Sequence, residues 1–264
     1  MSKSDTFFQF PIGALRIGEP LDAVGQDVAS GRINAIIDFC LLNVGRSLLD
    51  DNPDRYGHIL DRVCASDGID ETRLSDDQLL LYVAADVLNV SFPSPPAYRP
   101  AMDRYREINS LAKASGKTQV RLRANLLWDA RDGQFTWREL AVLCGIYAGV
   151  GAAQAKRLSY ARISTLSVGY DNREALKGSD AEEYELSPKR MRATVAKLHQ
   201  RGLFVAACPN GRHRWYSNRL SMDGLIDYLA EREAKRIIAA EAARVPDEIA
   251  RRTAAKLREL KKGS

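Results

Sequence analysis

The segment from Leu186 to Met222 holds the side chains best suited to binding phosphate. Its 37 residues contain no aspartate or glutamate. They contain eight basic residues: Lys189, Arg190, Arg192, Lys197, Arg201, Arg212, Arg214 and Arg219. The whole chain has a formal net charge of +5, so the residues outside this segment sum to −3. Clustered positive charge attracts polyanions, and the sequence therefore predicts a phosphate-binding surface here.

A helix is predicted over residues 188–201 of this segment. Ser187 is a good N-cap, and Pro188 falls at the first helical position, where its missing N–H costs nothing. Gly202 follows as a stop signal. Three apolar residues recur at helical spacing and form one buried stripe: Met191, Val195 and Leu198. The residues on the opposite face are Lys189, Ala193, Ala196 and Gln200, flanked by Arg190 and Lys197 on one side and by Arg192 and His199 on the other.

A β-hairpin is predicted directly after this helix. Residues 203–207 form a short apolar run, and residues 213–217 form the returning strand. The turn Pro209-Asn210-Gly211 lies between them, next to Arg212, His213 and Arg214. Trp215 and Tyr216 are neighbours on the returning strand, so we expect one of them to be buried.

The order of helix, strand, basic turn and strand resembles the winged helix-turn-helix superfamily of DNA-binding proteins over residues 135–220. The resemblance implies that residues 188–201 are a recognition helix in the major groove and that residues 208–214 are a wing on the DNA backbone. It implies duplex DNA as the partner, without cofactor or metal. The candidate contact residues are Lys189, Arg190, Arg192, Ala193, Lys197, Gln200, Arg212, His213 and Arg214. Amide and arginine side chains can read base edges, while the flanking cations can hold phosphates.

The rest of the chain is predicted to be mainly helical. We expect a helical N-terminal domain over 1–116, the winged domain over 117–220 and a helical extension over 221–264. Capping boxes at Ser75 and Thr136 mark two helix starts, and further helices are expected over 100–114 and 118–131. Residues 162–170 fit either a strand or the second helix of the winged domain. The acidic stretch 170–186 is either an insert or evidence that this second helix is misplaced.

The C-terminal tract has apolar residues at helical spacing from Leu225 to Ala242, and Pro246 is expected to break the helix. A new helix is then predicted from Asp247. Two alternatives describe the tract: a helix packed back on the core, or an arm through which two copies pair. The three phenylalanines Phe7, Phe8 and Phe10 are expected to pack against the N-terminal domain, which could also bind a protein partner.

Several function classes lack support in the sequence. The four cysteines are isolated, which argues against a zinc site or a disulfide framework and favours buried free thiols. No apolar run approaches a membrane span. No phosphate-binding glycine loop or catalytic triad is present, so we do not expect an enzyme. We expect a cytoplasmic transcriptional regulator or a replication initiator of a mobile element. The alternative is a non-enzymatic scaffold whose winged domain contacts protein or single-stranded nucleic acid.

Overall fold

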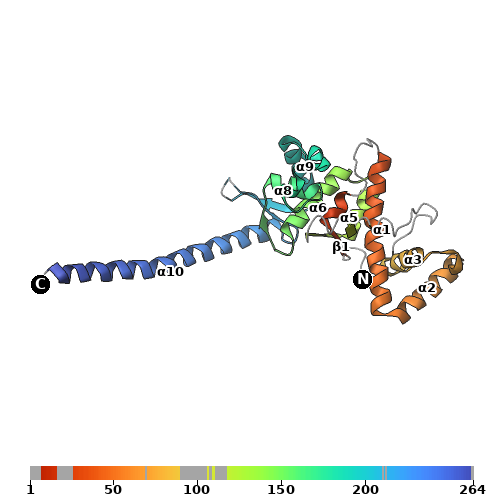
Figure 1. The fold of residues 1–264 in the computed structure, drawn as a ribbon, viewed down its shortest axis with the longest axis horizontal. Helices are drawn as coiled ribbons and strands as arrows, with labels where there is room; N and C mark the ends of the chain where they lie inside the picture. Colours follow the sequence, from red (N-terminus) through yellow and green to blue (C-terminus); the bar gives the residue numbers. More distant parts are fainter. Residues whose placement is uncertain are drawn as a thin grey trace.

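The computed structural model describes residues 7–16, 26–68, 70–89, 106, 109–110, 118–209, 211 and 213–262, and for residues 26–32, 35, 67, 180, 183 and 243–262 it describes the backbone alone. The described chain is mainly helical, with a two-stranded and a three-stranded antiparallel sheet (Figure 1). One hydrophobic cluster extends through the helices and strands on both sides of the predicted boundary at residue 116. From this body a single long helix projects.

Three helices lie at the N-terminal side of the molecule. Helix α1 (Gln26–Asp51) is followed by α2 (Pro53–Asp67), a 3-10 turn η2 (Glu71–Arg73) and α3 (Asp76–Leu88). The capping box predicted at Ser75 is confirmed, because its hydroxyl accepts from the Gln78 N–H while the Gln78 side chain accepts from the Ser75 N–H. The helix predicted over 100–114 lies mostly outside the described residues. Within this range only residues 106, 109 and 110 are described, and all three are helical.

The first sheet joins the start of the chain to its middle. Strand β1 (Phe7–Pro11) pairs antiparallel with β2 (Gln119–Arg123), and a 3-10 turn η1 (Ile12–Arg16) follows β1. The single helix predicted over 118–131 is therefore wrong in its first part, and only α5 (Ala124–Arg131) is helical. Residues 119–123 alternate exposed and buried along the strand, the period-two pattern of a half-buried sheet.

The three N-terminal phenylalanines divide between the two faces of β1. Phe8 and Phe10 are buried, as expected, whereas Phe7 points outward and is 44% exposed. The expectation that all three pack inside is thus wrong for Phe7, since alternate residues of a strand face opposite sides.

Helix α6 (Trp137–Val150) lies at the centre of the described core. The predicted capping box at Thr136 is confirmed, with Glu139 as its acidic partner. Every residue from Glu139 to Val150 is buried. Helix α6 packs along α7 (Tyr160–Ser167). Of the two alternatives predicted for residues 162–170, a strand or a helix, the structure has the helix.

The acidic stretch after α7 forms short elements of its own. It contains α8 (Arg173–Leu176) and the 3-10 turn η4 (Asp180–Tyr184) before α9 begins. Its buried residues Tyr170, Leu176 and Ala181 form a small apolar cluster of their own. This stretch is thus a packed part of the structure.

Helix α9 (Pro188–Gln200) precedes the second sheet, which is formed by β3 (Lys156–Arg157), β4 (Val205–Ala207) and β5 (Trp215–Ser217). The strand order is β3–β5–β4, and both pairings are antiparallel. The first strand of this sheet therefore comes from the segment between α6 and α7, and the hairpin after α9 supplies the other two.

Helix α10 (Met222–Lys262) is continuous, which corrects the predicted break at Pro246. Proline removes one backbone hydrogen bond, but the helix on both sides keeps its own bonds, and a carbonyl left free in an exposed helix can bond to water. The alternative of a helix packed back on the core holds only for the first turns, where Leu225 is buried, and is wrong beyond them. Residues 230–242 are all exposed, and the helix extends away from the body (Figure 1).

Candidate nucleic-acid interface

The local structure of α9 matches the sequence pattern. The Ser187 hydroxyl accepts a hydrogen bond from the Arg190 N–H, and Pro188 occupies the first turn. Met191, Val195 and Leu198 are buried to 1% exposure or less, so the predicted stripe anchors the helix on the core. Gly202 adopts a positive φ of 70° just after the helix, a conformation that glycine accepts without steric cost.

The opposite face of α9 is open to solvent. Its exposed residues are Lys189, Arg190, Arg192, Ala193, Ala196, Lys197 and Gln200. Small side chains occupy its centre, so another molecule can approach the helix backbone closely. The structure therefore brings together all six residues predicted on this helix.

Four cations of the acid-free segment have partners inside the protein. Lys197 forms an ion pair with Glu139 of α6. Arg201 donates to the Gln134 carbonyl at 2.8 Å and stacks on the Phe135 ring at 4.1 Å. Such internal contacts restrict what a cation can offer to an external phosphate.

The other two partnered cations hold the second sheet. Arg214 donates to the Tyr160 hydroxyl at 2.7 Å, at the start of α7. Arg219 donates to the carbonyls of Gly151 and Ala152 just after α6, at 3.1 and 2.8 Å. A cation at a helix C-terminus is stabilised by the helix dipole, so Arg219 stabilises the end of α6.

Lys189, Arg190 and Arg192 differ from these four, because their side chains form no ion pair, hydrogen bond or ring contact within the described part of the chain. Their position is also electrostatically unfavourable. They lie near the N-terminus of α9, whose first turn carries no acid, whereas the positive end of a helix dipole favours anions. An external phosphate would relieve this repulsion and could also accept from free backbone N–H groups.

The predicted wing is a hairpin turn between β4 and β5. Its described residues Cys208, Pro209, Gly211, His213 and Arg214 are exposed. Arg212 lies outside the described residues. The expectation of buried thiols is confirmed for Cys40 and Cys144 but is wrong for Cys208, which is exposed in this turn.

The two aromatic residues on the returning strand divide as predicted. Tyr216 is 1% exposed and its ring lies 5.7 Å from that of Phe204, so it belongs to the core. Trp215 is half-buried, with the Arg232 guanidinium 5.2 Å from its ring. Of the two, only Trp215 could contact a ligand.

Sequence reasoning missed the contribution of α10 and β3 to this surface. A groove of about 990 Å³ runs between the wing and α10, lined among others by Arg157, His213, Trp215, Arg232 and Lys235. Arg157 comes from a strand of two residues, too short to give a periodic signal. The charge of α10 was visible in the sequence, but its position beside the wing was not.

Glu139 links the first helix of this region to α9. Partial burial acts to raise its pKa, but hydrogen bonds from Lys197 and the Thr136 N–H, together with the lysine charge, outweigh it and hold the pKa below 4.5. A carboxylate whose pKa is lowered on folding stabilises the protein above its unfolded pKa, and this stabilisation is lost as pH falls through the folded pKa.

Replacing Glu139 with Gln is expected to lower the free energy of unfolding by about 1 kcal/mol at neutral pH, because glutamine can still cap α6 but cannot pair with Lys197. The difference from the unchanged protein should shrink as pH falls below 4.5. Urea denaturation at neutral pH and at about pH 3 measures both values. The exposed Glu174 provides the control, since Glu174→Gln should have little effect at either pH. A Glu139→Gln deficit that is the same at both pH values would contradict the assignment.

Other kinds of site find no support. Within the described residues there is no group of three or more histidine, cysteine or acidic side chains that could hold a metal ion. Burial raises the pKa of the Cys40 and Cys144 thiols, which makes them poor nucleophiles. None of the described helices is both long enough and apolar enough to cross a membrane. Comparisons of the chain with protein-family models, with curated proteins and with solved structures found no match.

Proposed function

We propose that this protein binds duplex DNA through a winged helix-turn-helix domain, with α9 in the major groove and the hairpin turn 208–214 on the backbone. The observation that carries the proposal is the group Lys189, Arg190 and Arg192. These three exposed cations have no ion-pair partner in the described chain and lie at a helix N-terminus that contains no acid. Such a group costs stability in the free protein, and contact with phosphates would offset that cost.

The arrangement of the elements supports the same proposal. The chain order α6, β3, α7, α9, β4, β5 and the strand order β3–β5–β4 are those expected of a winged domain, apart from the insert between α7 and α9. Gln200, Arg190 and Arg192 offer the amide and guanidinium groups that read base edges, and Lys189 offers an ammonium group. We propose that the protein acts in transcription control or in the initiation of replication on a mobile element. Both processes require a protein that recognises a defined site in duplex DNA.

Selection from random pools tests this function. The full chain is incubated with a random duplex pool and, separately, with a random single-stranded pool at about 0.15 M salt. We expect a defined sequence to be enriched from the duplex pool, with an affinity that falls steeply as salt increases. No enrichment, or retention of the single-stranded pool alone, would overturn the proposal and favour a scaffold role.

We further propose that α10 pairs two copies of the chain on DNA. Residues 230–242 are all exposed and gain little packing from their own body, although most helices depend on such packing for stability. Ile237 and Ile238 are 47% and 65% exposed on this stretch. A second copy of the same helix would cover them and would place two winged domains on two half-sites.

Ile238→Glu is expected to convert a dimer into a monomer, because a carboxylate at the paired surface would have to be buried without a partner. The molar mass in solution, measured by light scattering over a range of concentrations, reports the change. Ala239→Glu adds the same charge about 150° around the helix from the midpoint of the two isoleucines, and it should leave the dimer intact. A monomeric unchanged protein, or equal loss with both variants, would contradict pairing through this face.

A further inference from the structure

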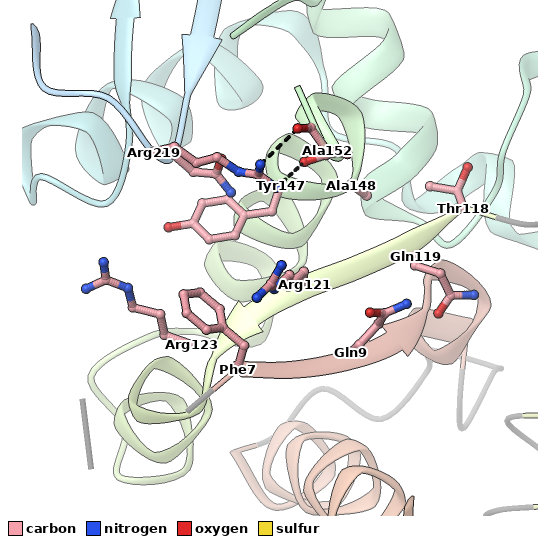
Figure 2. Close-up of a pocket in the computed structure, with 12 residues that line it drawn as sticks. Phe7, Gln9, Thr118, Gln119, Arg121, Arg123, Tyr147, Ala148, Ala152 and Arg219 are labelled. Carbon is pink, nitrogen blue, oxygen red and sulfur yellow. Dashed lines mark hydrogen bonds between the residues drawn. The ribbon is translucent and has the colours of Figure 1, made fainter. Parts of the chain in front are cut away.

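A second basic site lies away from α9, between the first sheet and α6. A pocket of about 690 Å³ is bounded by the outward face of β1 and β2, the C-terminal end of α6 and the residues just after β5 (Figure 2). Its volume falls within the range of about 300–1,000 Å³ that is usual for small-molecule sites. No residue of α9 lines it.

The charge of this pocket is entirely positive among its described lining residues. Arg121, Arg123 and Arg219 line it, and no aspartate or glutamate does. Arg121 and Arg123 alternate along β2, so both project from its solvent face toward the opening (Figure 2). Neither forms an ion pair within the described part of the chain. Three guanidinium groups around one hollow create a strong preference for an anion with several charges.

The guanidinium groups are held in place before any ligand binds. The Arg121 guanidinium lies 4.7 Å from the centre of the Phe7 ring, and that of Arg123 lies 5.9 Å from the same ring. An aromatic face supports a guanidinium without using its N–H donors, which stay free for an anion. Arg219 is fixed by its two bonds to the Gly151 and Ala152 carbonyls (Figure 2).

Neutral polar groups complete the pocket. Gln9, Thr118, Gln119 and Asn218 line it beside the arginines. The side-chain oxygen of Asn218 is buried and has no hydrogen-bond partner among the described residues. Buried polar atoms in folded proteins nearly always have a partner, so this oxygen is suited to accept from a donor on a bound molecule.

We propose that this pocket binds a small ligand with a diphosphate or triphosphate group, held by Arg121, Arg123 and Arg219. The amide and hydroxyl groups would contact the remainder of the ligand, as the sugar or base of a nucleotide would require. The site is a pocket on the outer face of a sheet, and its binding does not depend on the proposed contact between α9 and DNA.

Isothermal titration of the full chain tests the proposal, with pyrophosphate, tripolyphosphate, ADP, ATP and adenosine as separate titrants. We expect the phosphate-bearing titrants to bind and adenosine to give no heat of binding. ATP binding more tightly than tripolyphosphate would identify a nucleotide as the ligand, whereas equal affinity would identify the phosphate chain alone. Both results support the site.

Two variants locate the binding. Arg121→Gln/Arg123→Gln removes two exposed arginines and should weaken ATP and tripolyphosphate binding at least tenfold. Lys189→Gln/Arg190→Gln/Arg192→Gln removes cations from α9 and should leave that binding unchanged. Thermal unfolding curves check that both variants are folded, and Arg123→Gln alone serves if the double variant is not. Absence of binding to the unchanged protein would overturn the proposal. An equal loss with the α9 variant would overturn it as well.

Discussion

Replacing Lys189, Arg190 and Arg192 together with Gln is expected to weaken duplex DNA binding by about 100-fold at about 0.15 M salt, because three phosphate contacts are lost. The log–log slope of affinity against salt should become shallower by about 2.7, at roughly 0.9 for each lost contact. The free protein should become more stable at the same time. Lys189 and Arg190 lie in the first turn of α9, where each positive charge costs about 0.3–1 kcal/mol.

Fluorescence anisotropy with a selected duplex over a range of salt measures the affinity and the slope, and urea denaturation measures the stability. Arg55→Gln/Arg62→Gln/Arg73→Gln is the matched control. These three arginines are exposed on α2 and η2, and the change in net charge is the same. We expect the control to retain nearly full affinity and an unchanged slope. Equal losses in both triple variants would show that net charge alone governs binding and would contradict a site on α9.

The parts of the interface that are predictable from sequence depend on local rules. The stripe through Met191, Val195 and Leu198 follows from helical period, and the caps at Ser75 and Thr136 need only residues within one turn. These signals are short in range, so they require no knowledge of the tertiary fold.

The charge balance of the interface is not predictable in this way. The segment from Leu186 to Met222 contains no acid, yet Lys197 is paired with Glu139, an acid far outside that segment. Arg219 is one of the eight basic residues of the segment, but it caps the end of α6. Contacts with residues distant in sequence therefore occupy some of the basic residues of this segment. Fewer of its described cations remain available to an external phosphate.

The strand β2 and the helix α10 show two further limits of local reasoning. Residues 119–123 are followed directly by helix α5. A period-two pattern over only five residues is too short to show in the sequence where the strand ends and the helix begins. Its pairing partner β1 lies more than a hundred residues earlier, so the strand is specified by a long-range contact. At Pro246 the opposite holds, because a local breaker does not end a long helix.

Gly145→Ala is expected to lower the free energy of unfolding by about 2–3 kcal/mol, because α6 and α7 pack too closely at this point for a side chain. A β-carbon on Gly145 would lie 2.9 Å from the Ile163 carbonyl oxygen and 3.1 Å from the Ser167 nitrogen. These are backbone atoms, so α7 as a whole must move. The Ser167 hydroxyl, 2.8 Å away, is itself bonded to the Ile163 carbonyl and cannot easily rotate aside.

Two opposing effects decide this result, and a second glycine separates them. Alanine is favoured over glycine within a helix by about 0.5–1 kcal/mol, so Gly145→Ala can destabilise only if the clash outweighs that gain. A β-carbon on Gly57 of α2 would meet no described atom within 4 Å, so Gly57→Ala should show the gain alone and raise stability. Denaturant midpoints for the two variants should therefore shift in opposite directions. A rise in both would mean that α6 and α7 can separate at Gly145 without cost, and it would contradict the tight contact between these helices.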